Sequence, residues 1–193
     1  MSKSPSHRWL WVIVAALAAS NALLIWQNIQ MRREVERYQP RRLKPGDTVS
    51  PFKAAGLDGS PVEVSFEAGA RGKVLLFFSP SCPYCGEQFA HWRELMGRID
   101  ASRFEVVGLV NEKEDRGKVR EYLEKMGCAP GAPTPLRVAF IPAAVRNEYL
   151  LDSTPTTLVL NGEGTVEQNL IGRWTEAEAK AAGATLGFAR LTR

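Results

Sequence analysis

The sequence predicts an α/β domain with a mixed central sheet, preceded by a helix that crosses a membrane. An uncharged apolar stretch near the N-terminus and, after it, short apolar runs that alternate with amphipathic segments carry this prediction. With 193 residues, 45% of them hydrophobic and 24% charged, the chain can form one domain with a full core. The formal charge of +4 is modest and its basic residues do not form a stripe through the domain, so nucleic acid is not an expected partner.

The apolar stretch runs from Trp9 to Trp26, 18 residues without a charge. At helical rise it spans roughly 27 Å, which just crosses a bilayer core, and tryptophans at both ends suit the two interfaces. A cleaved signal peptide is the alternative, with Ala16–Ala18 as the small-residue site. Cleavage there would leave an apolar tail, so we favour an uncleaved signal anchor.

The charges around this stretch do not settle its orientation. Lys3 and Arg8 precede it, whereas five arginines and one lysine follow it between residues 32 and 44. A bare count would retain the following domain in the cytoplasm, but large domains translocate despite flanking charge. We expect an anchor in residues 1–30, a linker or short helical stalk in 31–44, and the globular domain in 45–193.

The domain is expected to alternate strands and helices. The run 73–79 reads as a fully buried strand, and the segment after it places Phe89, Trp92 and Leu95 on one helical face. Further strands are expected at 61–66, 104–110, near 136–140, 156–160 and 166–172, and helices at 84–99, about 113–126, after Pro142 and from Thr175. This order implies a mixed sheet flanked by helices.

Two of the three cysteines stand where the buried strand gives way to a helix. Cys82 lies near the helix N-terminus, where unpaired N–H groups and the helix dipole favour a thiolate. Cys85 lies one turn further and is more shielded, and Pro83 between them suits the first turn. The pattern predicts thiol–disulfide exchange, in which Cys82 attacks a disulfide and Cys85 resolves the mixed disulfide.

Other roles for these cysteines remain as alternatives. Zinc needs about four ligands, and beyond the pair the chain offers only Cys128, His91 and carboxylates, so no metal site is expected. A structural disulfide between positions three apart would close too small a loop to add much stability. Inert buried thiols are disfavoured at a strand-to-helix corner, and Cys128 reads as a free thiol.

Three stretches, "LKPGDTVSPFKAAGLDGSPVEV", "VLLFFSPSCPYC" and "STPTTLVLNGEG", resemble the TlpA-like branch of the thioredoxin superfamily, membrane-anchored thiol–disulfide oxidoreductases of bacteria. The resemblance implies a thioredoxin-like fold and a cis bond before Pro155 beside the dithiol. It leaves the backbone of Thr154 free to pair with a bound substrate segment. Pro83 and Tyr84, between the cysteines, complete the expected substrate-binding surface.

The same resemblance implies a single-pass protein of the inner membrane with its domain in the periplasm. It implies no bound cofactor beyond a redox-active Cys82–Cys85 disulfide. Expected partners are exported proteins with disulfides or thiols, apocytochrome c among them, and a membrane thiol-relay reductant. The chain departs from relatives at Leu76, where thioredoxin has aspartate, and at Gln88, where cytochrome-maturation reductases commonly have glutamate. These departures leave the direction of electron flow open.

Two other functions on the same fold compete with this interpretation. One is a copper-delivering module, although such relatives use a wider cysteine spacing and a late histidine, and no histidine follows His91. The other is a thiol peroxidase, because Ser79 stands three positions before Cys82. The nearby Cys85 fits dithiol exchange better than either.

Overall fold

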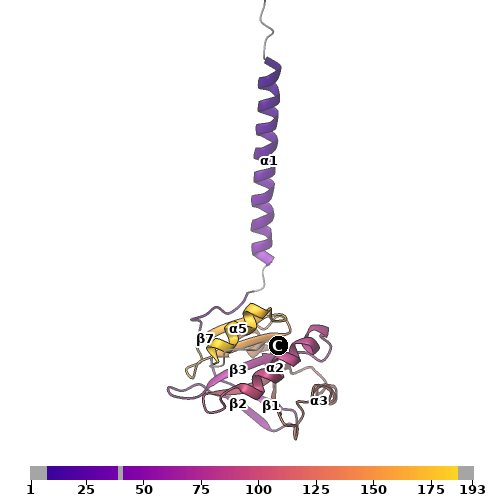
Figure 1. Cartoon of the computed structure of the whole chain (residues 1–193), viewed down its shortest axis with the longest axis vertical. Helices are drawn as coiled ribbons and strands as arrows, with labels where there is room; N and C mark the ends of the chain where they lie inside the picture. Colours follow the sequence, from indigo (N-terminus) through magenta and orange to yellow (C-terminus); the bar gives the residue numbers. More distant parts are fainter. Residues whose placement is uncertain (1–7, 39–40, 187–193) are drawn as a thin grey trace, which may run out of the picture. The chain divides into compact units, whose positions relative to one another are not determined.

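The computed structural model describes residues 8–38 and 41–186, and the chain divides into two compact units between Arg41 and Arg42. The first unit contains one long helix, α1 (Arg8–Tyr38), in Figure 1. Its segment Trp9–Glu34, with a mean hydropathy of 1.9, is long and apolar enough to cross a membrane. The helix extends past the expected anchor into the expected linker, as a helical stalk would.

The second unit is built on one mixed sheet of seven strands in the order β2-β1-β5-β4-β3-β6-β7. Its strands are β1 (Phe52–Gly56), β2 (Pro61–Val64), β3 (Gly72–Phe77), β4 (Phe104–Asn111), β5 (Arg137–Ile141), β6 (Thr156–Leu160) and β7 (Val166–Ile171). The central strands β3, β4 and β5 are parallel, and the outer pairings are antiparallel. The predicted mixed sheet is confirmed.

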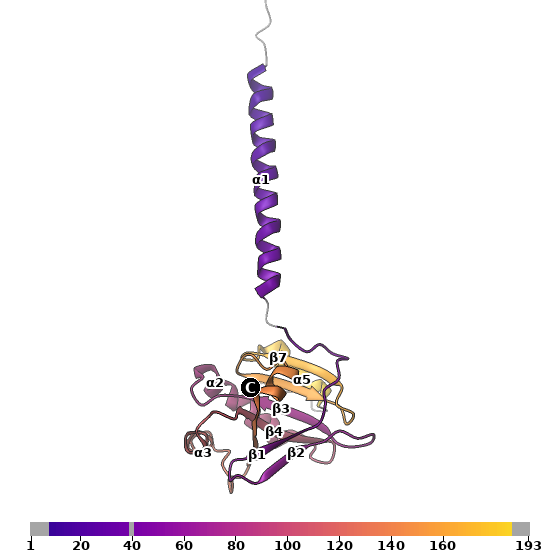
Figure 2. The ribbon, with the colours of Figure 1, turned by 180° about the vertical axis from the view of Figure 1, so that it is seen from behind.

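Four helices accompany the sheet: α2 (Pro83–Arg98), α3 (Arg116–Lys125), α4 (Ala143–Glu148) and α5 (Glu176–Thr185). Side chains of α2, α3 and α5 pack with one face of the sheet, and those of α4 with the other. Figures 1 and 2 show the sheet from its two sides. Strand β3 contributes Val74 and Leu76 to one cluster and Leu75 and Phe77 to the other, and all six of its residues are buried.

Strand β1 was not expected from the sequence. Its residues, FKAAG, lack the β-branched side chains typical of strands. The strand forms because it pairs with β2 on one side and with β5 on the other. The Asp58-Gly59 pair between β1 and β2, with Gly59 at φ +89°, is the hairpin signal that marks it.

The sheet brings the two predicted motifs together. β3 and β6 are antiparallel neighbours, with Phe77 opposite Thr156. The segment after β3 and the segment before β6 therefore lie at the same edge of the sheet. The indole N–H of Trp92 donates to the Thr157 hydroxyl at 2.9 Å, a buried link between α2 and β6. This contact fixes the helix that carries the cysteines relative to the strand that follows Pro155.

Candidate redox site

Cys82 is the N-cap residue of α2. Its backbone is extended, with φ −85° and ψ 115°, and Pro83 occupies the first helical position, where no N–H is needed. The Cys82 N–H donates to the Ser79 carbonyl at 3.1 Å, which closes a turn after β3. The thiol is half-buried and donates to the Thr154 carbonyl at 3.3 Å. The expected position of this sulfur at a helix N-terminus is confirmed.

Competing effects act on the Cys82 thiol. Burial raises its pKa, but hydrogen bonds with the Thr154 side chain and with Cys85 oppose burial. The backbone N–H groups of Cys85 and Tyr84, in the first turn of α2, add to this opposition. Together they hold the pKa of Cys82 below the ordinary thiol value. More of this sulfur is therefore thiolate near neutral pH than in an unstructured peptide.

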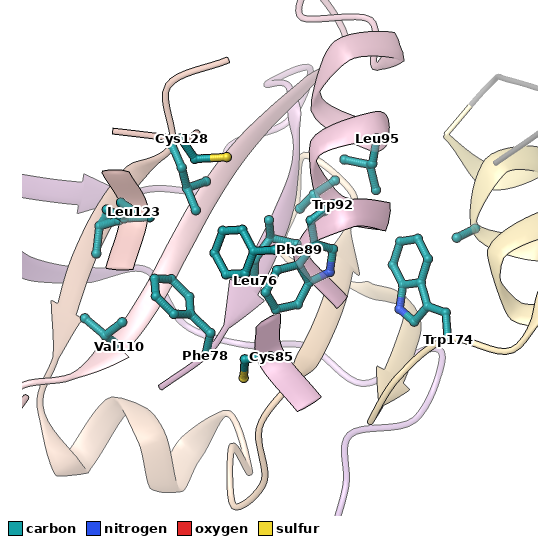
Figure 3. Close-up of a cluster of buried hydrophobic side chains, with 14 of the residues drawn as sticks. Leu76, Phe78, Cys85, Phe89, Trp92, Leu95, Val110, Leu123, Cys128 and Trp174 are labelled. Carbon is teal, nitrogen blue, oxygen red and sulfur yellow. The ribbon is translucent and has the colours of Figure 1, made fainter. Parts of the chain in front are cut away.

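Cys85 is fully buried, with 0% of its surface exposed. It belongs to the cluster that contains Phe78 and Phe89, and Figure 3 shows its side chain beside Phe78 at the start of α2. Burial raises the pKa of Cys85 to about 12, and the neighbouring Cys82 adds to this rise. The two sulfurs thus differ in both accessibility and ionisation. Cys82 is accessible to an external disulfide, whereas Cys85 can react only with Cys82.

Pro155 lies beside the dithiol. The Thr154–Pro155 peptide bond is cis, as the resemblance implied, and Pro155 is buried. The Pro155 carbonyl accepts a hydrogen bond from the Gly172 N–H at 2.7 Å, so this carbonyl already has a partner in the residue that follows β7. The Thr154 N–H makes no hydrogen bond with any residue in 8–38 or 41–186. That donor is available to an extended segment laid against Cys82.

The structure brings Tyr84 and Pro83 to the same exposed surface. The Tyr84 side chain is 60% exposed, and among the described residues outside α1 it is the exposed large hydrophobic side chain. Pro83 is exposed beside it at the start of α2. With Cys82 and Thr154 these residues form one surface, so all six residues expected at the site, including buried Cys85 and Pro155, gather at one edge of the sheet.

Gln88 stands one turn after Cys85 and is also fully buried. Its Oε1 accepts from the Trp174 N–H at 2.9 Å, while its Nε2 has no partner among the described residues. Glu87 points outward and forms an ion pair with Arg173. Both contacts tie α2 to the segment before α5. Glu87 is exposed, and His91 is half-buried and stacks on the Trp174 ring.

The sequence did not single out Glu114 and Tyr122, two residues that the fold brings close to the segment that carries the dithiol. Ser79 donates to Glu114 Oε1 at 2.6 Å, from the segment between β4 and α3. Tyr122 of α3 stacks on Phe78 with ring centroids 5.9 Å apart, and its buried hydroxyl has no partner in the described part of the chain. Burial, then the Cys85 and Cys82 charges, raise the pKa of Tyr122. The helical spacing of Tyr122 with Val119 was the available signal for a core-facing side chain.

Cys128 is buried at 0% exposure, away from solvent, with its sulfur 3.6 Å from the Met126 carbonyl. Burial raises the pKa of this thiol, which makes it a poor nucleophile. Within residues 8–38 and 41–186, no three His, Cys, Asp or Glu side chains gather in an arrangement that could hold a metal ion.

The two thiols of the pair are expected to alkylate at different pH. In the reduced full chain, iodoacetamide should label Cys82 with a midpoint below the ordinary thiol pKa, whereas Cys85 stays unlabelled up to about pH 12. Mass spectrometry of the labelled peptides across a pH series measures both. The urea-unfolded chain is the control and should label all three cysteines with one common midpoint. Equal labelling of Cys82 and Cys85 in the folded chain would contradict this assignment.

A sheet with parallel central strands, a cysteine pair at the N-terminus of α2 and a cis-proline beside it define the chain as a thioredoxin-fold protein with a dithiol site. Residues 45–169 match the family model described as the AhpC/TSA family, and the chain belongs to that family. The resemblance inferred from the motifs is therefore confirmed at the level of the superfamily. No curated protein matches the sequence.

Solved structures share this fold. A Chlorobium tepidum protein named as the thiol:disulfide interchange protein DsbE is 22% identical with a TM-score of 0.60, covering 74% of this chain and 94% of its own. A secreted Mycobacterium tuberculosis disulfide oxidoreductase is 18% identical with a TM-score of 0.55, covering 70% and 96%. The peroxidoxin BcpB of the same organism is 22% identical with a TM-score of 0.58, covering 76% and 97%. At these identities the likeness shows the fold.

Proposed function

We propose that this chain is a membrane-anchored thiol–disulfide oxidoreductase that reduces disulfides in exported proteins. The observation that carries the proposal is the asymmetry of the pair: Cys82 is half-buried with a lowered pKa, and Cys85 is fully buried with a raised one. An attacking thiol needs access and thiolate character, and a resolving thiol needs only proximity. In this proposal the domain works at the periplasmic face of the inner membrane, and its support is that α1 contains a segment, Trp9–Glu34, long and apolar enough to anchor it.

The reaction follows from this asymmetry. A substrate segment pairs with the backbone of Thr154, which places its disulfide against Cys82. The Cys82 thiolate attacks one substrate sulfur, the substrate S–S bond breaks, and the leaving sulfur departs as a thiolate. Cys85 then gives up its proton to the substrate thiolate and attacks Cys82, so that the Cys82–Cys85 disulfide forms, the mixed disulfide breaks and the second substrate sulfur leaves. A membrane thiol-relay protein returns two electrons and two protons to the pair, so no cofactor other than the disulfide takes part.

Apocytochrome c is the substrate class that we propose first, because its paired cysteines must be reduced before haem attaches. The two alternatives have less support from the site. Ser79, on which a peroxidase would depend, already donates a hydrogen bond from its hydroxyl group to Glu114. For copper delivery, the histidines lie at or before position 91, and His91 stacks on Trp174 instead of facing the sulfurs.

Insulin reduction by the full chain in detergent tests the proposed activity. The wild-type chain should reduce insulin disulfides with dithiothreitol as electron donor, and Cys82→Ser should lose this activity by about 1,000-fold, because no other described thiol is accessible. Cys128→Ser, which removes the buried thiol outside the pair, is the matched control and should retain it. Insulin reduction that persists in Cys82→Ser would reject the mechanism, and rapid peroxide consumption dependent on Cys82 would favour the peroxidase.

A further inference from the structure

A pocket of about 420 Å³ lies between α3 and the residues just before Cys82. We call it the α3 pocket; its wall is formed by Pro80, Ser81, Glu114, Lys118, Glu121 and Lys125, and Tyr122 also lines it. Its volume is in the range of small-ligand sites, roughly 300–1,000 Å³. Ser81, the chain neighbour of the attacking cysteine, is part of this wall. The proposed reduction of protein disulfides, in which the substrate pairs with the Thr154 backbone, assigns no role to this pocket.

The pocket wall carries side chains of both charges. Lys118, Glu121 and Lys125 recur at the spacing of one helical face and are exposed. None of the three forms an ion pair with a residue in 8–38 or 41–186. Glu114 is half-buried and is held in place by the Ser79 hydroxyl. The wall therefore presents two carboxylates and two ammonium groups to one small volume.

A ligand for such a wall should carry opposite charges a few bonds apart. The free amino-acid end of a small molecule, with its α-ammonium beside its α-carboxylate, has this pattern. The interior of a protein segment has neither group, because both are consumed in peptide bonds. An ammonium would pair with Glu121 and Glu114, and a carboxylate with Lys118 and Lys125. The ligand's sulfur, two bonds from the α-carbon in cysteine, would then lie on the side of Cys82.

We propose that the α3 pocket binds the amino-acid end of small disulfides of the cystine class, so that the dithiol also reduces disulfides of low molecular weight. The inference rests on the proposed activity of the Cys82–Cys85 pair. Cys82 attacks one sulfur of the small disulfide, its S–S bond breaks, and one small thiol leaves. Cys85 attacks Cys82, the protein disulfide forms, and a second small thiol leaves. Two electrons and two protons pass from the dithiol to the small disulfide, and the balance needs no further reactant.

The test compares matched small disulfides on the reduced full chain in detergent. The probes are cystine and N,N′-diacetylcystine dimethyl ester, which has the same disulfide without charges. Each rate of oxidation of the pair is divided by the rate with which dithiothreitol reduces the same probe, which removes differences in intrinsic reactivity. Cystine should react about tenfold faster than the uncharged probe on this scale, as two exposed ion pairs would give.

Variants of the wall assign the preference to the pocket. Lys118→Gln and Glu121→Gln should each reduce the preference for cystine about threefold and leave the uncharged probe unchanged. Arg120→Gln is the matched control, since Arg120 lies on the same helix but lines a different pocket. Equal normalised rates for the two probes, or a preference that survives both wall variants, would overturn the proposal. Insulin reduction, measured in parallel, fails only if the proposed protein reductase activity is itself wrong.

Discussion

The Cys85→Ala variant is expected to accumulate covalent complexes with its protein substrates on Cys82. In the wild-type chain the mixed disulfide is short-lived, because Cys85 lies one helical turn from Cys82 and attacks it intramolecularly. Without that sulfur, only external thiols can release the substrate, and they react many orders of magnitude less effectively than a positioned neighbour. Non-reducing gels of alkylated membranes should show at least about 100-fold more adduct than the wild type.

The design of this trap depends on which sulfurs can be reached. Cys128 is fully buried, but it is the third thiol of the chain. The trap is therefore made in a Cys128→Ala background, in which Cys82 is the one remaining cysteine and every adduct must come from it. The Cys82→Ala/Cys85→Ala double variant is the control and should yield no adduct. The trapped proteins also report the compartment: exported proteins place the domain in the periplasm, whereas cytoplasmic partners would contradict the orientation that we propose. An absence of adducts in Cys85→Ala would reject Cys82 as the attacking thiol.

The sequence predicted the part of the fold that local patterns encode. Strand β6 begins and ends where its apolar run 156–160 does, and α5 begins after Thr175, whose side chain caps it with Glu178 in a capping box. Helix α3 is shorter than the expected 113–126, because Asp115 caps it and the chain before Arg116 forms a turn. Strand β1 escaped prediction, because its pairing with β5 across more than 80 residues, and not its composition, makes it a strand.

The residues of the candidate site also fall into those that local sequence patterns indicate and those that only the folded structure brings together. Cys82 and Cys85 stand in a short local motif, which was enough to place them at the start of a helix, whereas the cis bond before Pro155 was expected only from the family resemblance. The contacts between Ser79 and Glu114 and between Gln88 and Trp174 join residues 35 and 86 positions apart. No local pattern encodes such pairs, because they exist only once α2, α3 and the segment before α5 pack around β3. The α3 pocket belongs to this second class.

Gln88→Glu is expected to make the folding stability strongly dependent on pH. Gln88 is fully buried one turn from Cys85, and its Oε1 accepts one hydrogen bond, from the Trp174 N–H. One such bond does not compensate for burying a carboxylate, so a glutamate here should have its pKa raised in the folded state. In the unfolded chain its pKa is about 4.3. Above that pH the unfolded state releases a proton that the folded state keeps, so the free energy of unfolding falls as the pH rises.

The expected slope is about 1.4 kcal/mol per pH unit, from about pH 4.3 up to the folded-state pKa of the new carboxyl. Urea unfolding of the full chain in detergent, followed by near-UV circular dichroism across this range, measures it against wild type. Ala90→Glu adds the same charge at an exposed position of α2 and should show no such slope. If the two variants have parallel profiles, the buried position tolerates a charge. If only Gln88→Glu shows this slope, an ionisable carboxyl group buried near Cys85 lowers the stability of the fold. The neutral amide of Gln88 then serves to hold α2 to Trp174.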